Sequence, residues 1–132
     1  IMNVLTLSIK RKFFDEILAG TKKQEFRELT PKSSNKHILY VDSSNGKEYG
    51  NADDIPDGES EIDVKPIGYD ALKLCTGSYK GKRPYIIVKI EKAKVEFFDD
   101  ENGEPETYEY EGKEYLAAQI VYSLGEIIEK SI

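Results

Sequence analysis

The chain has 132 residues, 39% of them hydrophobic, which suits one domain over residues 1–132 with its own core. No apolar run approaches the ~18 residues that a membrane helix needs and no signal-peptide pattern is present, so we expect a cytoplasmic protein without a membrane partner. The lone Cys75 and lone His37 exclude an internal disulfide and the usual zinc clusters, and we expect neither metal nor cofactor.

The net charge of −6 argues against binding a long duplex through bulk electrostatics. The charge is uneven, however. Residues 1–40 have eight Lys and Arg against four Asp and Glu, a net +4, and the other residues have eleven against 21, a net −10. A locally basic cleft on an acidic protein suits one small anionic or nucleotide ligand better than a duplex.

The chain begins with a strand and a helix. Apolar residues alternate over residues 4–9, which predicts a short strand. Over residues 11–19 they recur at helical spacing, as in Phe13 and Ile17, and this predicts a helix whose apolar stripe packs into the core. Gly20 follows the last periodic residue, where a helix exit favours a positive φ.

The next segments are two strands and a long acidic loop. We expect strands at residues 23–29 and 38–41, and a surface excursion at residues 42–65 with a short strand near Ile62 and Val64. The excursion has eight acids and two lysines. Its central carboxylates do not have the EF-hand spacing, so a solvated loop is favoured over a calcium site: Asp53, Asp54, Asp57, Glu59 and Glu61.

The second half of the chain is typical of a β-protein. We expect a strand at 71–75, in which Cys75 is a buried residue, followed by a basic loop at 77–84. Asn102-Gly103 predicts a turn, and strands are expected at 107–110 and 115–122, joined at Gly112. The tail at 124–128 is either a helical turn or a last strand. The longest predicted strand covers residues 85–98. Its apolar residues change parity near Glu91 and Lys92, which predicts a bulge or bend that lets a sheet close on itself.

The segment Gly20-Thr21-Lys22-Lys23-Gln24-Glu25-Phe26-Arg27 concentrates the chemistry. Glu25 and Arg27 are two residues apart on one predicted strand and share a face, while Lys22 lies at the helix–strand turn. Such a cluster can hold a phosphate or polar base through Lys22 and Arg27, oriented by Glu25. It can also depress the pKa of the lysine and leave an amine that acts as base or nucleophile. An ordinary ion pair on a strand surface is the structural alternative.

This segment resembles the ASCH domain family, a relative of the RNA-binding PUA domain, whose motif is G-x-K-x-x-E-x-R after the first helix. Gly20, Lys22, Glu25 and Arg27 occupy the motif positions, and the match covers roughly residues 3–29. The resemblance implies an α+β, mostly β fold: a PUA-like closed or partly open β-barrel with one N-terminal helix and a cleft beside the motif. It also implies a ligand that is RNA or a modified nucleoside.

Three functions remain open. In a binding module, Gly20, Lys22, Glu25 and Arg27 form the ligand site, and a tyrosine stacks on the base, with Tyr40, Tyr69 and Tyr79 as candidates. In a hydrolase, Lys22 and Glu25 are catalytic and Arg27 stabilises the oxyanion. The resemblance implies an amidohydrolase of acetylated cytidine or a ribonuclease, although the deacetylating type has threonine in place of Glu25. The third function is a protein–protein adaptor that uses the acidic face.

Overall fold

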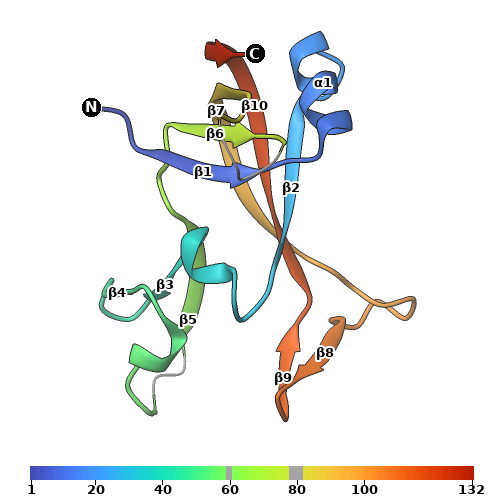
Figure 1. Cartoon of the computed structure of the whole chain (residues 1–132). Coiled ribbons are helices and arrows are strands. Elements are labelled where there is room, and N and C mark those ends of the chain that lie inside the picture. The colour runs from blue at the N-terminus through green and yellow to red at the C-terminus, as the bar shows by residue number, and fades with distance from the viewer. Residues whose placement is uncertain (59–60, 78–81) are drawn as a thin grey trace. The chain divides into compact units, whose positions relative to one another are not determined.

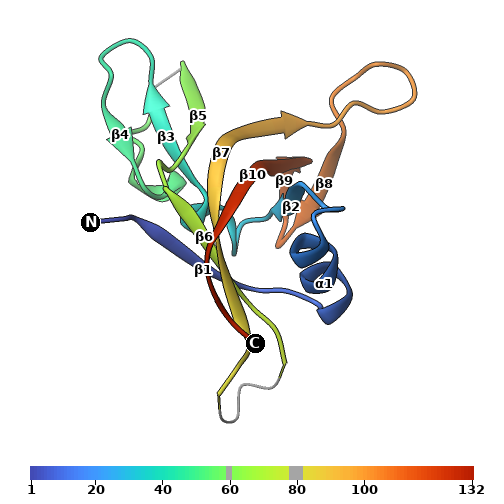
Figure 2. The same cartoon turned by 90° about the horizontal axis from the view of Figure 1, so that it is seen from above.

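The computed structural model describes residues 1–58, 61–77 and 82–132 (Figure 1), and Figure 2 shows the same fold from above. The chain forms two compact units, each assembled from segments that are distant in sequence. Unit 1 contains residues 1–25, 68–93 and 122–132, and unit 2 contains residues 26–67 and 94–121. Each unit is described by itself below.

Unit 1 is built on the pairing of three strands. β1 (Val4–Ser8) runs parallel to β6 (Ala71–Cys75), and β6 runs antiparallel to β7 (Tyr85–Phe97), so β6 is the inner strand. β6 is buried along nearly its whole length, as expected for an inner strand. Its side chains therefore form a large part of the core of unit 1. The residues of unit 1 with almost no exposed surface are Phe14, Ala71, Leu72, Leu74, Ile86, Val88 and Tyr122.

The N-terminal helix is confirmed with the predicted limits. α1 (Arg11–Ala19) buries Phe14 and Ile17, which lie on the apolar stripe. Lys10 precedes the helix without a side-chain cap, and Gly20 ends it in the left-handed conformation with φ of 79°. An added Cβ at Gly20 meets no atom within 4 Å, so the backbone conformation, and not the space around it, is what favours glycine here.

The strands form three sheets among the described residues. The largest has the order β1-β6-β7-β10-β2, with β2 at Gln24–Leu29 and β10 at Ala118–Ser131; β2, β7 and β10 contribute residues to both units. The protein is therefore a mostly-β α+β fold with one α-helix near the N-terminus in the described chain. In the described residues this strand order begins at β1 and ends at β2, and the closed or partly open barrel stays a prediction.

Unit 2 contains a three-stranded sheet in which β3 (Ile38–Asp42) lies between β4 (Glu48–Tyr49) and β5 (Ile62–Pro66), both antiparallel to it (Figure 1). The predicted strand near residues 62–64 is confirmed. The acidic excursion has more structure than we expected, because β4 and a short 3-10 helix (Ala52–Asp54) lie within it. A further 3-10 helix, Ser34–Lys36, precedes β3.

A two-stranded hairpin completes unit 2. β8 (Thr107–Tyr110) pairs with β9 (Lys113–Leu116) through a turn in which Glu111 and Gly112 have φ of 49° and 79°. The predicted single strand at 115–122 is wrong, because β9 ends at Leu116 and β10 starts at Ala118. The tail at 124–128 is a continuation of β10, so the helical alternative is wrong as well.

The long strand β7 changes its buried face part-way along its length. Within β7, burial changes parity at Glu91 and Lys92: Ile86 and Val88 are buried before it, and Ala93 and Val95 are half-buried after it. The apolar pattern had predicted this change. Within the described part of the chain, no helix combines the length and the apolar character needed to cross a membrane.

Candidate functional site

The turn that follows α1 places Lys22. The carbonyl oxygen of Glu16 accepts hydrogen bonds from the backbone N–H of Thr21 at 3.0 Å and of Lys22 at 3.1 Å, and from the Thr21 hydroxyl at 3.2 Å. Gly20 N–H donates to the Ile17 carbonyl at 3.1 Å. These bonds satisfy carbonyl groups that the helix leaves without partners at its end, and they hold the backbone of Lys22 against the last turn of α1.

Lys22 and Glu25 form a partly buried ion pair in unit 1. The Lys22 ammonium lies 3.7 Å from Oε1 of Glu25 and 5.2 Å from the centre of the Phe13 ring. The exposed fraction is 17% for the Lys22 side chain and 7% for Glu25. A charged group this deeply buried requires compensation, and an opposite charge together with an aromatic face supplies it. The pair is therefore more than a solvated surface contact.

The strand that carries Glu25 is tied to the C-terminal strand of the chain. The Lys23 carbonyl accepts a hydrogen bond from the Leu124 N–H at 2.9 Å, so β2 is held beside β10 in the residues next to the motif. The structure thus brings three of the four motif residues, Gly20, Lys22 and Glu25, into one unit. A lysine ammonium has three donors and can contact a ligand oxygen, and a neighbouring carboxylate restricts its direction.

Unit 1 is basic as a whole. It has twelve Lys and Arg residues and seven Asp and Glu residues, a net charge of +5. Unit 2 has seven and eighteen, a net charge of −11. The exposed described cations of unit 1 come from all three of its segments: Lys10, Arg11, Lys12, Lys23, Lys82, Lys89, Lys92 and Lys130. The positive field that an anionic ligand requires is therefore centred on the unit that contains Lys22.

The fourth motif residue, Arg27, belongs to unit 2, where it is half-buried. Its charge acts on His37, a residue that is only 2% exposed. Burial, then Lys36 and then Arg27 lower the pKa of His37 from 6.5 to about 4, so its imidazole is neutral at physiological pH. Arg27 and His37 are thus electrostatically coupled within unit 2.

The other residues singled out from the sequence have different positions. Tyr40 lies in unit 2 and lines a cavity of that unit. Tyr69 is half-buried in unit 1, and burial raises its pKa. Tyr79 lies outside the described residues. Cys75 is a buried free thiol, and its carbonyl oxygen accepts hydrogen bonds from the Ile9 N–H at 2.9 Å and from the Arg83 guanidinium at 3.2 Å.

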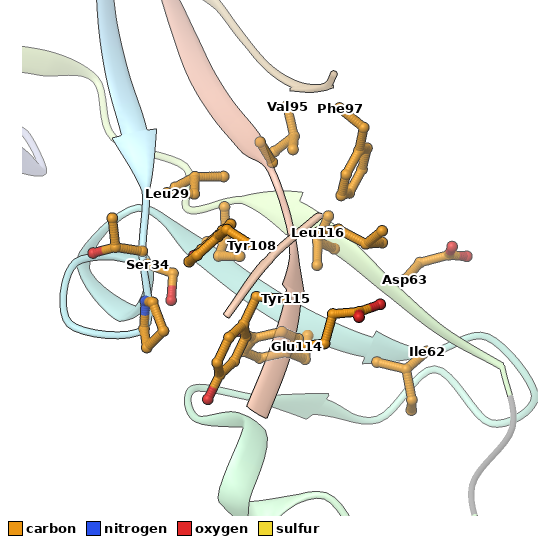
Figure 3. A pocket seen from close by; sticks show the side chains of 16 residues that line it. Leu29, Ser34, Ile62, Asp63, Val95, Phe97, Tyr108, Glu114, Tyr115 and Leu116 are labelled. Carbon is orange, nitrogen blue, oxygen red and sulfur yellow. The ribbon is translucent and has the colours of Figure 1, made fainter. Parts of the chain in front are cut away.

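The cavity in unit 2 was not predicted. It has a volume of about 630 Å³ and is bordered by β3, β5, the end of β7 and the hairpin β8–β9. Figure 3 shows side chains of these elements around it, with Phe97 and Val95 from β7, Ile62 and Asp63 from β5, and Tyr115 and Glu114 from β9. Phe97 and Leu116 are 53% and 52% exposed, so large apolar side chains of the wall remain open to solvent.

Tyrosines dominate the polar part of this wall. The rings of Tyr108 and Tyr115 stack with centres 5.8 Å apart at an angle of 27°. Burial raises the pKa of Tyr108, and the nearby Glu28, Tyr115 and Tyr40 raise it further. The concentration of tyrosine and glutamate over residues 107–115 is the sequence signal that could have indicated this wall, because residues of both types line the cavity.

Comparison with known proteins finds no matching family model, no matching curated protein and no matching solved structure. The resemblance to the ASCH family therefore depends on the motif residues and on the helix–strand context that the structure gives them. Among the described residues, no group of three or more His, Cys, Asp or Glu side chains is placed to hold a metal ion.

Proposed function

We propose that this chain is an ASCH-type domain of PUA-like architecture that binds RNA or a nucleoside in the cytoplasm, with Lys22 as the central ligand-binding residue. The observation that carries the proposal is the Lys22–Glu25 pair: the Lys22 side chain is 17% exposed, and its ammonium lies 3.7 Å from the buried Glu25 carboxylate, just after a helix that ends at glycine. Its position in a unit of net charge +5 supports an anionic ligand.

The Lys22–Glu25 pair suits recognition of a nucleotide because its contacts restrict the lysine before the ligand binds. A lysine on a flexible stem loses rotamer entropy when it binds, and the contacts of Lys22 with Glu25 and Phe13 already restrict it in the unliganded protein. In the proposed complex the Lys22 ammonium donates to a phosphate or base carbonyl, while a carboxylate oxygen of Glu25 accepts from an exocyclic amino group.

The first test is the binding of a short single-stranded RNA, measured by fluorescence anisotropy at several salt concentrations. Lys22→Ala should weaken binding more than tenfold, and the plot of log affinity against log salt should become less steep. Lys130→Ala is the matched control, because it removes one charge from an exposed position of the same unit. Equal losses in the two variants, or no binding by the wild-type chain, would contradict the proposal.

The buried carboxylate beside the lysine also supports a second candidate, a hydrolase that acts on a modified nucleoside. In that mechanism Lys22 activates water or attacks an amide carbonyl, and Glu25 transfers the proton. Incubation with acetylated cytidine, with the released acetate measured, tests this directly. Turnover that is lost in Lys22→Ala and in the near-isosteric Glu25→Gln would establish the hydrolase; RNA binding without turnover would leave the binding module.

A further inference from the structure

We propose that the cavity of unit 2 is a second ligand site, which binds a small organic cation with an apolar body. This site goes beyond the proposed function: it lies in the unit of opposite charge and shares no lining residue with the Lys22–Glu25 pair. Its volume of about 630 Å³ is in the range of cavities that hold small molecules.

The charges of the wall select a positive ligand. The two charged residues that line the cavity are both acidic, Asp63 from β5 and Glu114 from β9, and none of the described lining residues is a lysine or an arginine. Asp63 and Glu114 are also exposed, so a ligand that enters from solvent can reach their carboxylates. Unit 2 as a whole has a net charge of −11, which raises the local concentration of cations.

The aromatic side chains select an organic cation. Four aromatic rings from four different strands line the cavity, and two of them stack on each other: Tyr40, Tyr108, Tyr115 and Phe97. The face of an aromatic ring attracts an ammonium group, especially one whose alkyl substituents make desolvation easy. Leu29, Ile38 and Val64 complete an apolar wall that an alkyl or aryl body of the ligand can cover.

The hairpin has an unfavourable charge arrangement that a cation would relieve. Glu109 of β8 stands directly opposite Glu114 of β9 in the antiparallel register. Side chains at directly opposed positions lie on the same face, roughly 5 Å apart at Cβ, and like charges there destabilise the pair. A cation bound beside Glu114 offsets this repulsion, so ligand binding should stabilise the hairpin as well as fill the cavity.

Other classes of ligand fit this wall less well. A phosphate would face Asp63 and Glu114 without any lysine or arginine from the described lining residues. A hard metal cation such as Ca²⁺ prefers six to eight oxygen ligands, whereas most residues of this wall are aliphatic or aromatic. A ligand that combines a positive charge with an apolar body uses both kinds of lining residue.

The test compares three probes on the intact chain by isothermal calorimetry: benzyltrimethylammonium, its uncharged carbon isostere neopentylbenzene, and benzoate. We expect the cation to bind at least tenfold more tightly than the isostere and benzoate not to bind. Equal affinity for the cation and the isostere, or no binding of the cation, would overturn the proposal. This comparison uses the wild-type protein, so it does not depend on the folding of any variant.

Two double variants then locate the site. Asp63→Asn with Glu114→Gln should weaken cation binding at least tenfold and leave RNA binding unchanged. Asp57→Asn with Glu101→Gln is the matched control, because it removes two charges from exposed positions of unit 2 that do not line the cavity. Similar losses in the two double variants would refute the assignment to this cavity. Lys22→Ala should leave cation binding intact, which keeps the two proposed sites experimentally separate.

Discussion

The neutral, buried His37 makes the stability of the protein depend on pH. Its pKa is about 4 in the folded chain, against 6.5 for an unperturbed histidine. Between these values the unfolded chain binds a proton that the folded chain does not, so stability falls as pH falls. The full contribution is present above pH 6.5 and is lost as the pH falls through 6.5 towards 4. It amounts to about 3 kcal/mol in total and roughly 2 kcal/mol by pH 5.

Urea denaturation at pH 7, 6 and 5, followed by circular dichroism, measures this loss. Because carboxylates also respond to acid, the useful quantity is the difference between the wild-type chain and His37→Gln, which has no titrating group at this position. The variant should be less stable at pH 7 but should lose about 2 kcal/mol less between pH 7 and pH 5. Parallel curves for the two proteins would refute the reasoning.

The titration can also be observed without any variant. The chain has one histidine, so a single Cε1–Hε1 imidazole signal is expected in a carbon–proton NMR spectrum. Its chemical shift should remain that of neutral imidazole down to about pH 5. A midpoint near 6.5 in the folded protein would mean that the burial and the two nearby cations do not have the effect inferred from the structure.

Three other changes test the region around the motif. Arg27→Gln should raise the pKa of His37, because Arg27 is one of the charges that lower it, and the same NMR signal reports the result. Lys22→Met should destabilise the fold by about 1–3 kcal/mol in urea, because it leaves the Glu25 carboxylate buried without this cation, and adding Glu25→Gln should recover part of the loss. Gly20→Ala should cost about 1–2 kcal/mol through its φ of 79°, with thermal unfolding as the measurement; an unchanged melting temperature would contradict this.

The elements best predicted from the sequence are those with local signals. The i,i+4 apolar pairs and the terminal glycine define α1, and the parity change of apolar residues at Glu91 and Lys92 matches the burial of β7. Both signals arise from residues close together in the chain. β4 was missed because its two residues, Glu48 and Tyr49, have no recognisable period, and only their pairing with β3 makes them a strand.

The candidate site was predicted in part for the same reason. Lys22 and Glu25 are three residues apart, so the helix exit and the start of β2 suffice to bring them together. The cavity of unit 2 depends on residues from distant segments, such as Tyr40, Asp63 and Phe97, and no local pattern predicts their convergence. Tertiary structure also decides that His37 is buried, which the sequence around it does not indicate.

The distribution of charge shows why an average over the sequence is a weak guide to ligands. The net charge of −6 argued against nucleic acid, and the basic first 40 residues only partly corrected that argument. The grouping of charges in the folded protein differs from their grouping along the sequence. Residues 68–93 and 122–132 belong to the basic unit 1, whereas residues 26–40 belong to the acidic unit 2. A field is produced by charges that are close in space, within about a Debye length of ~8 Å at physiological salt. The relevant totals are therefore +5 and −11, and they support ligands of opposite sign on the two units.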